Sequence, residues 1–164
     1  MAATFYHATE QAFPLAELEH YCCRVVAAAY MEAAKVLVFC ADATQMQRLD
    51  AALWDFSPYS FIAHECLPET IQASVPAPAN TPVLLSCAAQ LPYDSEQRDA
   101  LVVAPGASLP DFAARFTHAH YVVNTDGGEQ HQRARQDLSR LKHLGFSVSN
   151  KKIAARSKAA PRSG

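Results

Sequence analysis

Val36-Leu37-Val38-Phe39-Cys40 is a continuous apolar run. It has the length of a strand and the composition expected of a strand buried on both faces, as in a parallel sheet. Before it, apolar residues recur at spacings of three and four from Leu15 to about Ala34, which predicts a helix with one buried side. After it, Asp42 or Thr44 is suited to cap a second helix. The sequence therefore predicts a helix, a buried strand and a helix in succession.

Short segments rich in β-forming residues recur along the rest of the chain. We expect strands at residues 3–7, 60–64, 83–86, 100–103, 120–123 and 146–148. Residues 65–82 hold four prolines and no clear period, which indicates a loop. A short helix near 111–116 and a longer one from about 129 to 144, ended by Gly145, complete the pattern. Strands alternating with helices predict a single-domain, Rossmann-like α/β fold, with a mostly parallel sheet and helices on both faces.

Composition restricts the class of protein. The chain has 164 residues, of which 50% are hydrophobic and 18% charged, as expected of one globular domain. No apolar run approaches the roughly 20 residues of a membrane span, and the N-terminus lacks the basic region of a secretory signal. The five cysteines are an odd number without a C-x-x-C pair, which is typical of reduced structural thiols. We therefore expect a cytoplasmic protein without membrane contact.

The charge is distributed unevenly along the chain. Net charge is −2, yet residues 133–164 hold nine of the fourteen basic residues and a single acid, Asp137. This asymmetry predicts that the C-terminal part meets an acidic partner, whether nucleic acid, an acidic peptide or an anionic surface. We divide the chain into an α/β domain, residues 1–150, and a basic tail, residues 151–164, which we expect to be disordered.

The residue patterns of common active sites are missing from the sequence. Residues 7–11 and 41–44, which follow the first two predicted strands, contain no glycine to bring backbone N–H groups onto a phosphate. His118 and His120 lie on the same side of a predicted strand and form a candidate pair of metal ligands, although two ordinary histidines are the favoured interpretation. His64 and Cys66 are neighbours in sequence, which rarely makes a catalytic pair. We expect a non-enzyme without nucleotide loop, metal or cofactor.

The last helical segment carries the most informative pattern. Its apolar arc, expected to face the core, consists of Ala134, Leu138 and Leu141. One shoulder of this arc, beside Leu138, holds His131, Arg135 and Lys142. The other holds Arg133 and Arg140, within reach of Asp137. The pattern fits an ordinary amphipathic helix with a solvated basic face. It also fits a ledge where carboxylates meet Arg135 and Lys142 while an apolar side chain lies against Leu138, and the local positive charge favours this second interpretation.

Several segments resemble the chi subunit of bacterial DNA polymerase III. They are Ala3-Thr4-Phe5-Tyr6, the R-L-D-x-x-L-W stretch from Arg48 to Trp54, Ser60-Phe61-Ile62-Ala63-His64 followed by Pro82-Val83, and Arg135 to Phe146 with its Gly-Phe turn. The resemblance covers about residues 3–150. It implies a Rossmann-like fold without catalysis, whose members join the psi subunit and through it the clamp loader, and so associate with DNA indirectly. It also implies binding to the acidic, phenylalanine-ending tail of single-stranded DNA-binding protein.

The resemblance places the tail site on Arg135 and Lys142. Between them this chain has Leu138-Ser139 where the family commonly has Tyr-Lys, so Arg140 or His131 is expected to replace the missing cation. For the psi contact it implies Phe61, Ile62 and His64, with Trp54 near one of the two surfaces. Trp54 and Phe61 are equally well explained as core aromatic residues. The alternative function is direct nucleic-acid binding by the basic helix and tail, although that segment has no aromatic platform for base stacking.

Overall fold

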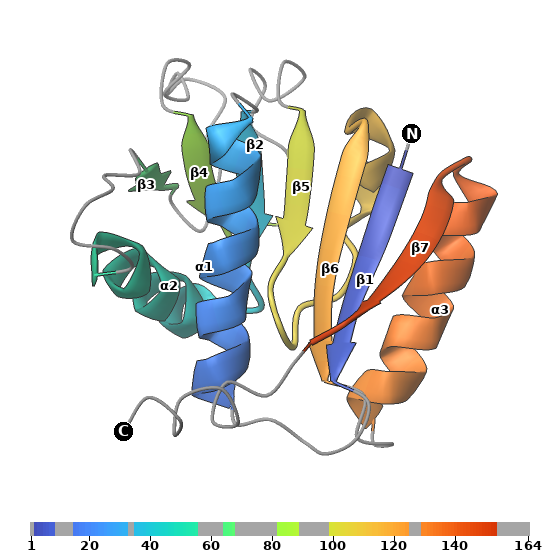
Figure 1. The fold of residues 1–164 in the computed structure, drawn as a ribbon, viewed down its shortest axis with the longest axis horizontal. Coiled ribbons are helices and arrows are strands. Elements are labelled where there is room, and N and C mark those ends of the chain that lie inside the picture. Colours follow the sequence, from blue (N-terminus) through green and yellow to red (C-terminus); the bar gives the residue numbers. More distant parts are fainter. Residues whose placement is uncertain are drawn as a thin grey trace, which may run out of the picture.

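The computed structural model describes residues 2–8, 15–32, 35–55, 64–67, 82–88, 99–124 and 129–153. These residues build a sheet of seven strands in which every neighbouring pair is parallel. The order across the sheet is β3-β4-β2-β5-β6-β1-β7, so the N-terminal strand lies beside the last one (Figure 1).

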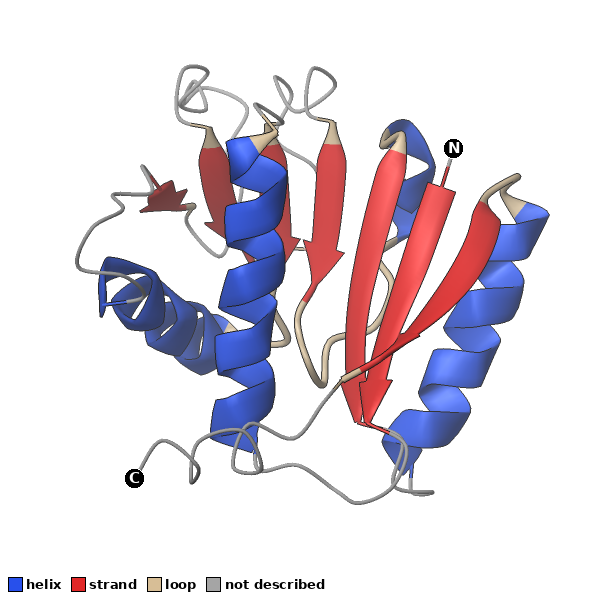
Figure 2. Ribbon diagram, in the orientation of Figure 1, coloured by secondary structure: helices blue, strands red, loops and turns tan. Residues whose placement is uncertain are grey.

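Helices cover both faces of this sheet (Figure 2). The strands are β1 (Ala2–Ala8), β2 (Val36–Phe39), β3 (His64–Cys66), β4 (Val83–Ser86), β5 (Ala100–Val103), β6 (His118–Asn124) and β7 (Ser147–Lys152). The helices are α1 (Leu15–Met31), α2 (Ala43–Asp55), α3 (Glu129–His143) and the short 3-10 helix η2 (Asp111–Arg115). None of the helices described is long and apolar enough to cross a bilayer.

Alternate residues of the central strands enter two separate cores. In β2, Val36 and Val38 join the core beneath α1 and α2, whereas Leu37 joins the core beneath α3 and η2. Leu18 of α1 contributes to the first core and Leu141 of α3 to the second. Because both faces of the strand are buried, a continuous apolar run is what the position requires. The predicted Rossmann-like fold is confirmed.

Some predicted element boundaries differ from those observed. Helix α1 ends at Met31 rather than near Ala34. Of the strand predicted at 60–64, only His64 lies in the described part, where it is the first residue of β3 and pairs with β4. Strand β7 runs to Lys152, past the domain boundary predicted at residue 150, because its backbone continues the parallel ladder with β1. Ile153 then donates its N–H to the carbonyl of His7 at 2.9 Å and is buried.

The cysteines are all free thiols. Cys22, Cys23 and Cys40 are buried in the core beneath α1 and α2. Burial raises the pKa of the Cys23 thiol to about 12, with a smaller contribution from Glu19. Burial likewise raises the pKa of Cys22 and Cys40, so these thiols stay protonated at neutral pH. They are packing residues, as their sequence context indicates.

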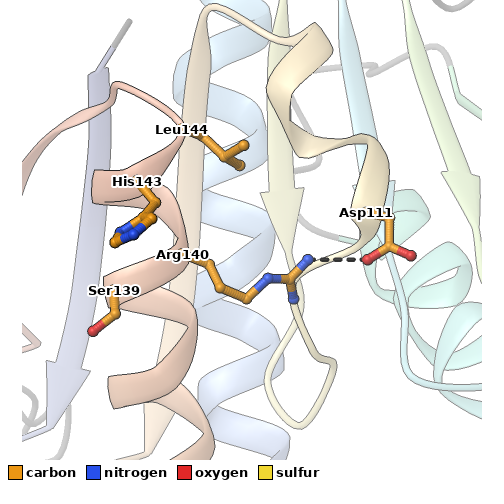
Figure 3. Close-up of a pocket in the computed structure, with 5 residues that line it drawn as sticks. All are labelled: Asp111, Ser139, Arg140, His143 and Leu144. Atoms are coloured by element: carbon orange, nitrogen blue, oxygen red, sulfur yellow. Dashed lines mark hydrogen bonds and ion pairs between the residues drawn. The ribbon is translucent and has the colours of Figure 1, made fainter.

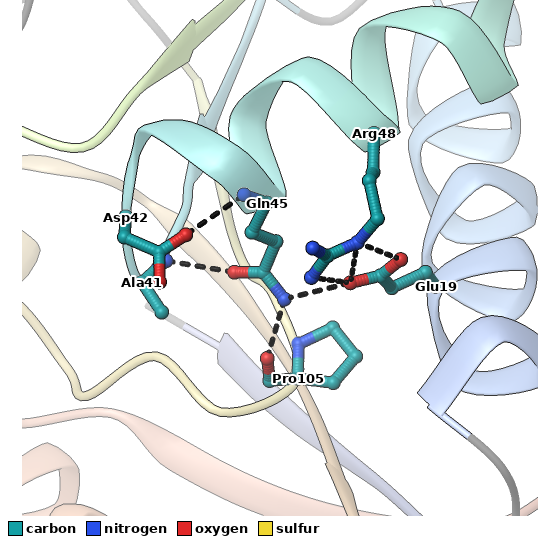
Figure 4. A network of polar contacts seen from close by, with 6 residues as sticks. All are labelled: Glu19, Ala41, Asp42, Gln45, Arg48 and Pro105. Carbon is teal, nitrogen blue, oxygen red and sulfur yellow. Dashed lines mark hydrogen bonds and ion pairs between the residues drawn. The ribbon is translucent and has the colours of Figure 1, made fainter.

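A polar network closes the border between β2 and β5 at their carboxyl ends. After β2 the chain continues on the face covered by α1 and α2, whereas after β5 it continues on the face covered by α3 and η2. Folds of this class usually bind their ligands where two neighbouring strands diverge in this way. The Gln45 side-chain amide donates to the Pro105 carbonyl at 2.6 Å and to Glu19 at 3.2 Å, and its oxygen accepts from Ala41 N–H at 2.7 Å (Figure 4). The Asp42 carboxylate accepts the Gln45 backbone N–H at 2.8 Å and caps α2. The chain's own carboxamide and carboxylates thus lie at the point where folds of this class usually bind ligands.

Arg48 balances the buried end of this network, because it donates twice to the Glu19 carboxylate, at 2.8 and 3.0 Å. Glu19 is only 6% exposed. We expect Arg48→Ala to lower the free energy of unfolding by about 1–2 kcal/mol, less than for a fully buried pair because the arginine itself is half exposed. Urea denaturation measures the loss. Arg24→Ala on α1, where the guanidinium lies over the Tyr21 ring, is the control, and equal losses would contradict this role of Arg48.

Candidate functional site

The inner side of α3 is formed by Ala134, Asp137 and Leu141, all buried. The sequence predicted Leu138 in place of Asp137, but Leu138 is only partly buried at the edge of the core. The reason is that Asp137 has strong hydrogen-bond donors inside. Its carboxylate accepts the Tyr121 hydroxyl at 2.5 Å and the Leu109 N–H at 3.0 Å. A buried carboxylate is stable when donors of this kind replace water.

Tyr121 fixes this carboxylate from the sheet. Its ring stacks on Phe5 of β1, with centroids 4.8 Å apart, and its hydroxyl also lies 3.1 Å from the Ala107 carbonyl. Burial and the hydrogen bond to Asp137 raise the pKa of Tyr121 far above its usual value, so the phenol remains a donor. The sequence contained one indication that Asp137 is buried. It is the only acid of the basic C-terminal segment, and it lies three residues after Ala134 and four before Leu141, on the same side of the helix as both.

Arg140 binds acceptors of the chain itself (Figure 3). Its guanidinium donates to the Asp111 carboxylate at 3.0 Å and to the Leu109 carbonyl at 3.0 Å, and it lies 3.5 Å from Asp137. It therefore joins α3 to the segment around η2, and its charge is offset by two carboxylates. Arg133, on the same shoulder, donates to the Gly106 carbonyl at 3.3 Å rather than to Asp137. The expectation that Arg140 supplies a spare cation is not supported by these contacts.

A pocket of about 350 Å³ opens beside this arginine. It is lined by Asp111, Ser139, Arg140, His143 and Leu144 (Figure 3). The sequence predicted an apolar niche beside Leu138, between Arg135 and Lys142, whereas the pocket lies on the other shoulder of the helix.

The turn after α3 places the apolar wall of the pocket. Gly145 has φ +96°, a left-handed conformation that glycine adopts without steric cost. The Gly145 N–H donates a hydrogen bond to the Lys142 carbonyl at 3.1 Å. The N–H of the buried Phe146 donates to the Leu141 carbonyl at 3.0 Å. This ends the helix and leaves Leu144 38% exposed at the pocket, one of the few large apolar side chains on the described surface.

Arg135 and Lys142 lie together on the outer surface of α3. Both are exposed, and neither side chain makes a hydrogen bond or ion pair within the described part of the chain. They are seven positions apart in the sequence, so their Cα atoms lie about 10 Å apart along one helix face. Leu138 lies between them on that face. The backbone of His131 continues the same row, but its side chain lies outside the described residues.

A second exposed feature lies at the end of α2. The Trp54 side chain is 56% exposed, so the interpretation of Trp54 as a core residue is wrong. Its ring lies 4.9 Å from the His64 ring, and His64 Nε2 lies 3.0 Å from the Asp50 carboxylate. The His64 side chain is itself fully buried, which gives it the position of a support beneath Trp54. Phe61 and Ile62 lie outside the described residues.

These observations define a class: a Rossmann-like α/β protein whose usual ligand position is closed by its own side chains, and whose exposed features are a cationic helix and a tryptophan. Comparison with known proteins specifies it further. The chain belongs to the family described as DNA polymerase III chi subunit, HolC, whose model matches residues 1–149. This membership implies an accessory role in DNA replication.

Two curated relatives are similar over most of their length. The DNA polymerase III subunit chi of Haemophilus influenzae is 27% identical over 151 residues, which cover 92% of this chain and 96% of that protein. The subunit chi of Escherichia coli is 30% identical over 135 residues, which cover 82% of this chain and 84% of that protein. The resemblance seen in the sequence is therefore confirmed at the level of the family.

Proposed function

We propose that this chain is a non-catalytic adaptor of the DNA polymerase III holoenzyme. It links the clamp loader, through the psi subunit, to the acidic C-terminal tail of single-stranded DNA-binding protein. The observation that supports this most is the row of two exposed cations, Arg135 and Lys142, which have no counter-ion in the described part of the chain. An anionic ligand supplies what this row lacks, and family membership indicates which ligands to test.

In this proposal, the acidic tail of single-stranded DNA-binding protein crosses α3 over Ser139. This small, exposed side chain lies on the outer surface between the cationic row and the pocket that His143 and Leu144 line. Acidic side chains of the tail pair with Arg135 and Lys142, and its terminal aromatic ring enters the pocket against Leu144. Serine at this position leaves the path open where a longer side chain would fill it. The interface is small, below about 1,200 Å² in total, and transient.

Peptide titration tests the tail site. An acidic peptide ending in phenylalanine should bind the full chain, and its affinity should fall as salt screens the exposed charges. The same peptide without the final phenylalanine should bind more weakly at every salt concentration, because it leaves the pocket empty. Equal affinity for both peptides would remove the pocket from the site. Tighter binding of a single-stranded oligonucleotide than of the peptide would favour direct nucleic-acid binding instead.

The psi contact is centred on Trp54. The exposed Trp54 ring lies against the buried side chain of His64, which in turn contacts the partly exposed Asp50 carboxylate. Trp54 therefore presents a large apolar surface held in place from below, and tryptophan is a residue type that dominates protein interfaces. His64 contributes by supporting that ring, since its own side chain is buried.

Trp54→Ala is expected to weaken binding of the psi subunit by about 2 kcal/mol, or roughly 30-fold, because it removes the apolar anchor. Calorimetric titration of the two purified subunits measures this. Met31→Ala is the matched control, since Met31 is another exposed large apolar residue, on a different helix. If the control weakened binding as much as Trp54→Ala, Trp54 would not be the centre of the contact.

A further inference from the structure

A second pocket, of about 300 Å³, lies where the last turn of α1 meets the amino ends of β5 and β6. Its polar lining consists of Glu32, Asp99, Thr117, His118 and His120. The two histidines are two apart on β6 and so point to the same face of the sheet. That face carries α1, because the next residue in this series, Val122, belongs to the core beneath α1. The pocket is therefore on the opposite face from the tail site on α3.

The contacts of the Thr117 hydroxyl favour one tautomer of His118. The Thr117 hydroxyl donates its single proton to the Asp99 carbonyl at 3.1 Å. The same oxygen lies 3.2 Å from His118 Nδ1, so in this contact it has to accept, and Nδ1 carries the proton. In the neutral imidazole, Nε2 then has a free lone pair. This is the arrangement that orients a metal-binding histidine: one ring nitrogen held by a protein group, the other open to the ion.

The hydroxyl of Tyr6 holds His120 at Nδ1, and when it accepts the Nδ1 proton it leaves the Nε2 lone pair open. His120 Nδ1 lies 2.9 Å from the Tyr6 hydroxyl, and Nε2 has no hydrogen-bond partner among the described residues.

The surroundings favour a cation. The carboxylates of Glu32 and Asp99 belong to the pocket lining, and no lysine or arginine lines the pocket among the described residues. The pocket also adjoins the C-terminal end of the 17-residue helix α1, where the helix dipole is negative and no basic residue offsets it. Within the described part, no three histidine, cysteine or acidic side chains are arranged to hold an ion together. A site here has two imidazole ligands, and water completes the coordination.

We propose that Nε2 of His118 and Nε2 of His120 together bind a late first-row divalent metal ion, for which Zn²⁺ is the probe. Imidazole nitrogens suit this class of ion, and the two carboxylates attract it and accept hydrogen bonds from its bound water. The sequence favoured two ordinary histidines. The pocket, the tautomer of His118 and the surrounding charges are what change this interpretation.

Calorimetric titration of the untagged full chain with Zn²⁺ tests the proposal. We expect one ion per chain, and a loss of affinity of at least about tenfold in His118→Ala and in His120→Gln. Thr117→Val keeps the shape but removes the hydroxyl that orients His118, and it should weaken binding by about tenfold. His7→Asn is the control, because Ala3 and Phe5, on the same side of β1 as His7, belong to the core beneath α3.

Imidazole nitrogen NMR supplies the second measurement. On addition of Zn²⁺, the Nε2 resonances of His118 and His120 should shift, whereas the histidines elsewhere should not. Far-UV circular dichroism establishes that each variant is folded. Binding that survives in both histidine variants, or no saturable binding by the unmodified chain, would overturn the proposal. The affinity for the acidic tail peptide should be unchanged in His118→Ala. A failure of the metal-site proposal is therefore distinguishable from a failure of the proposed adaptor function.

Discussion

Arg135→Glu should abolish binding of the acidic tail peptide while leaving the fold intact. In the proposed complex, Arg135 makes charge-assisted hydrogen bonds to tail carboxylates, each contributing about 1.5–3 kcal/mol where partly desolvated. The reversal removes these and adds repulsion, so affinity should fall by at least about 100-fold. The fold is unaffected because the side chain is exposed and makes no hydrogen bond or ion pair in the described structure. Fluorescence titration with a labelled peptide gives the affinity, and circular dichroism reports the fold.

Arg24→Glu is the matched control for net charge. Arg24 is an exposed arginine on α1, on the opposite face of the sheet from α3. Its reversal changes the overall charge equally, so a purely long-range effect would weaken both variants alike. Lys142→Glu should behave like Arg135→Glu, since the two cations share one helix face. Unchanged affinity of Arg135→Glu would remove that residue from the site and leave the cationic row without its proposed role.

Asp137→Ala is expected to lower the free energy of unfolding by about 3–5 kcal/mol, because it removes a buried carboxylate and leaves its donors without their acceptor. The Leu109 N–H loses its hydrogen bond, while the Tyr121 hydroxyl retains the Ala107 carbonyl. Arg140 loses one of its two carboxylate partners. Urea denaturation followed by circular dichroism measures the change.

The variant Asp111→Ala tests whether Asp137 stabilises the fold through its buried hydrogen bonds or through its charge. Asp111 contacts the same arginine as Asp137 does, yet its side chain is fully exposed. Exposed ion pairs contribute little, so this variant should unfold at nearly the same urea concentration as the unmodified chain. If the two aspartate variants were equally destabilised, the anchor would be the ion pair with Arg140 and not the buried hydrogen bonds of Asp137.

Part of the candidate site was predictable because it depends on one helix alone. The spacing of Arg135 and Lys142 along α3 places them on a shared face in any structure that contains this helix. The family signature added the partners to be tested. Trp54 was identified as a candidate interface residue from the same signature, but its exposure was undecided, because an apolar side chain at the end of a helix fits a core and an interface equally well.

The contacts that shape the site were not predictable in this way. Arg140 pairs with Asp111, which is 29 residues away in sequence, and Asp137 accepts the Leu109 N–H, which is 28 away. Periodicity reports which side of a helix is apolar. It does not report which distant backbone groups lie beneath that side, so the sequence predicted Leu138 rather than Asp137 on the buried side and did not predict the pocket beside Arg140.

By itself, the sequence determined the layered architecture, since a five-residue apolar strand and helices with one apolar side have few ways to bury their surfaces other than a covered parallel sheet. It also determined the concentration of positive charge on the last helix. Which of those charges remain available depends on contacts that the chain makes only when it is folded. Arg140 is neutralised not only by Asp137 on its own helix but also by Asp111, which is 29 residues away in the sequence and lies near it only in the folded chain.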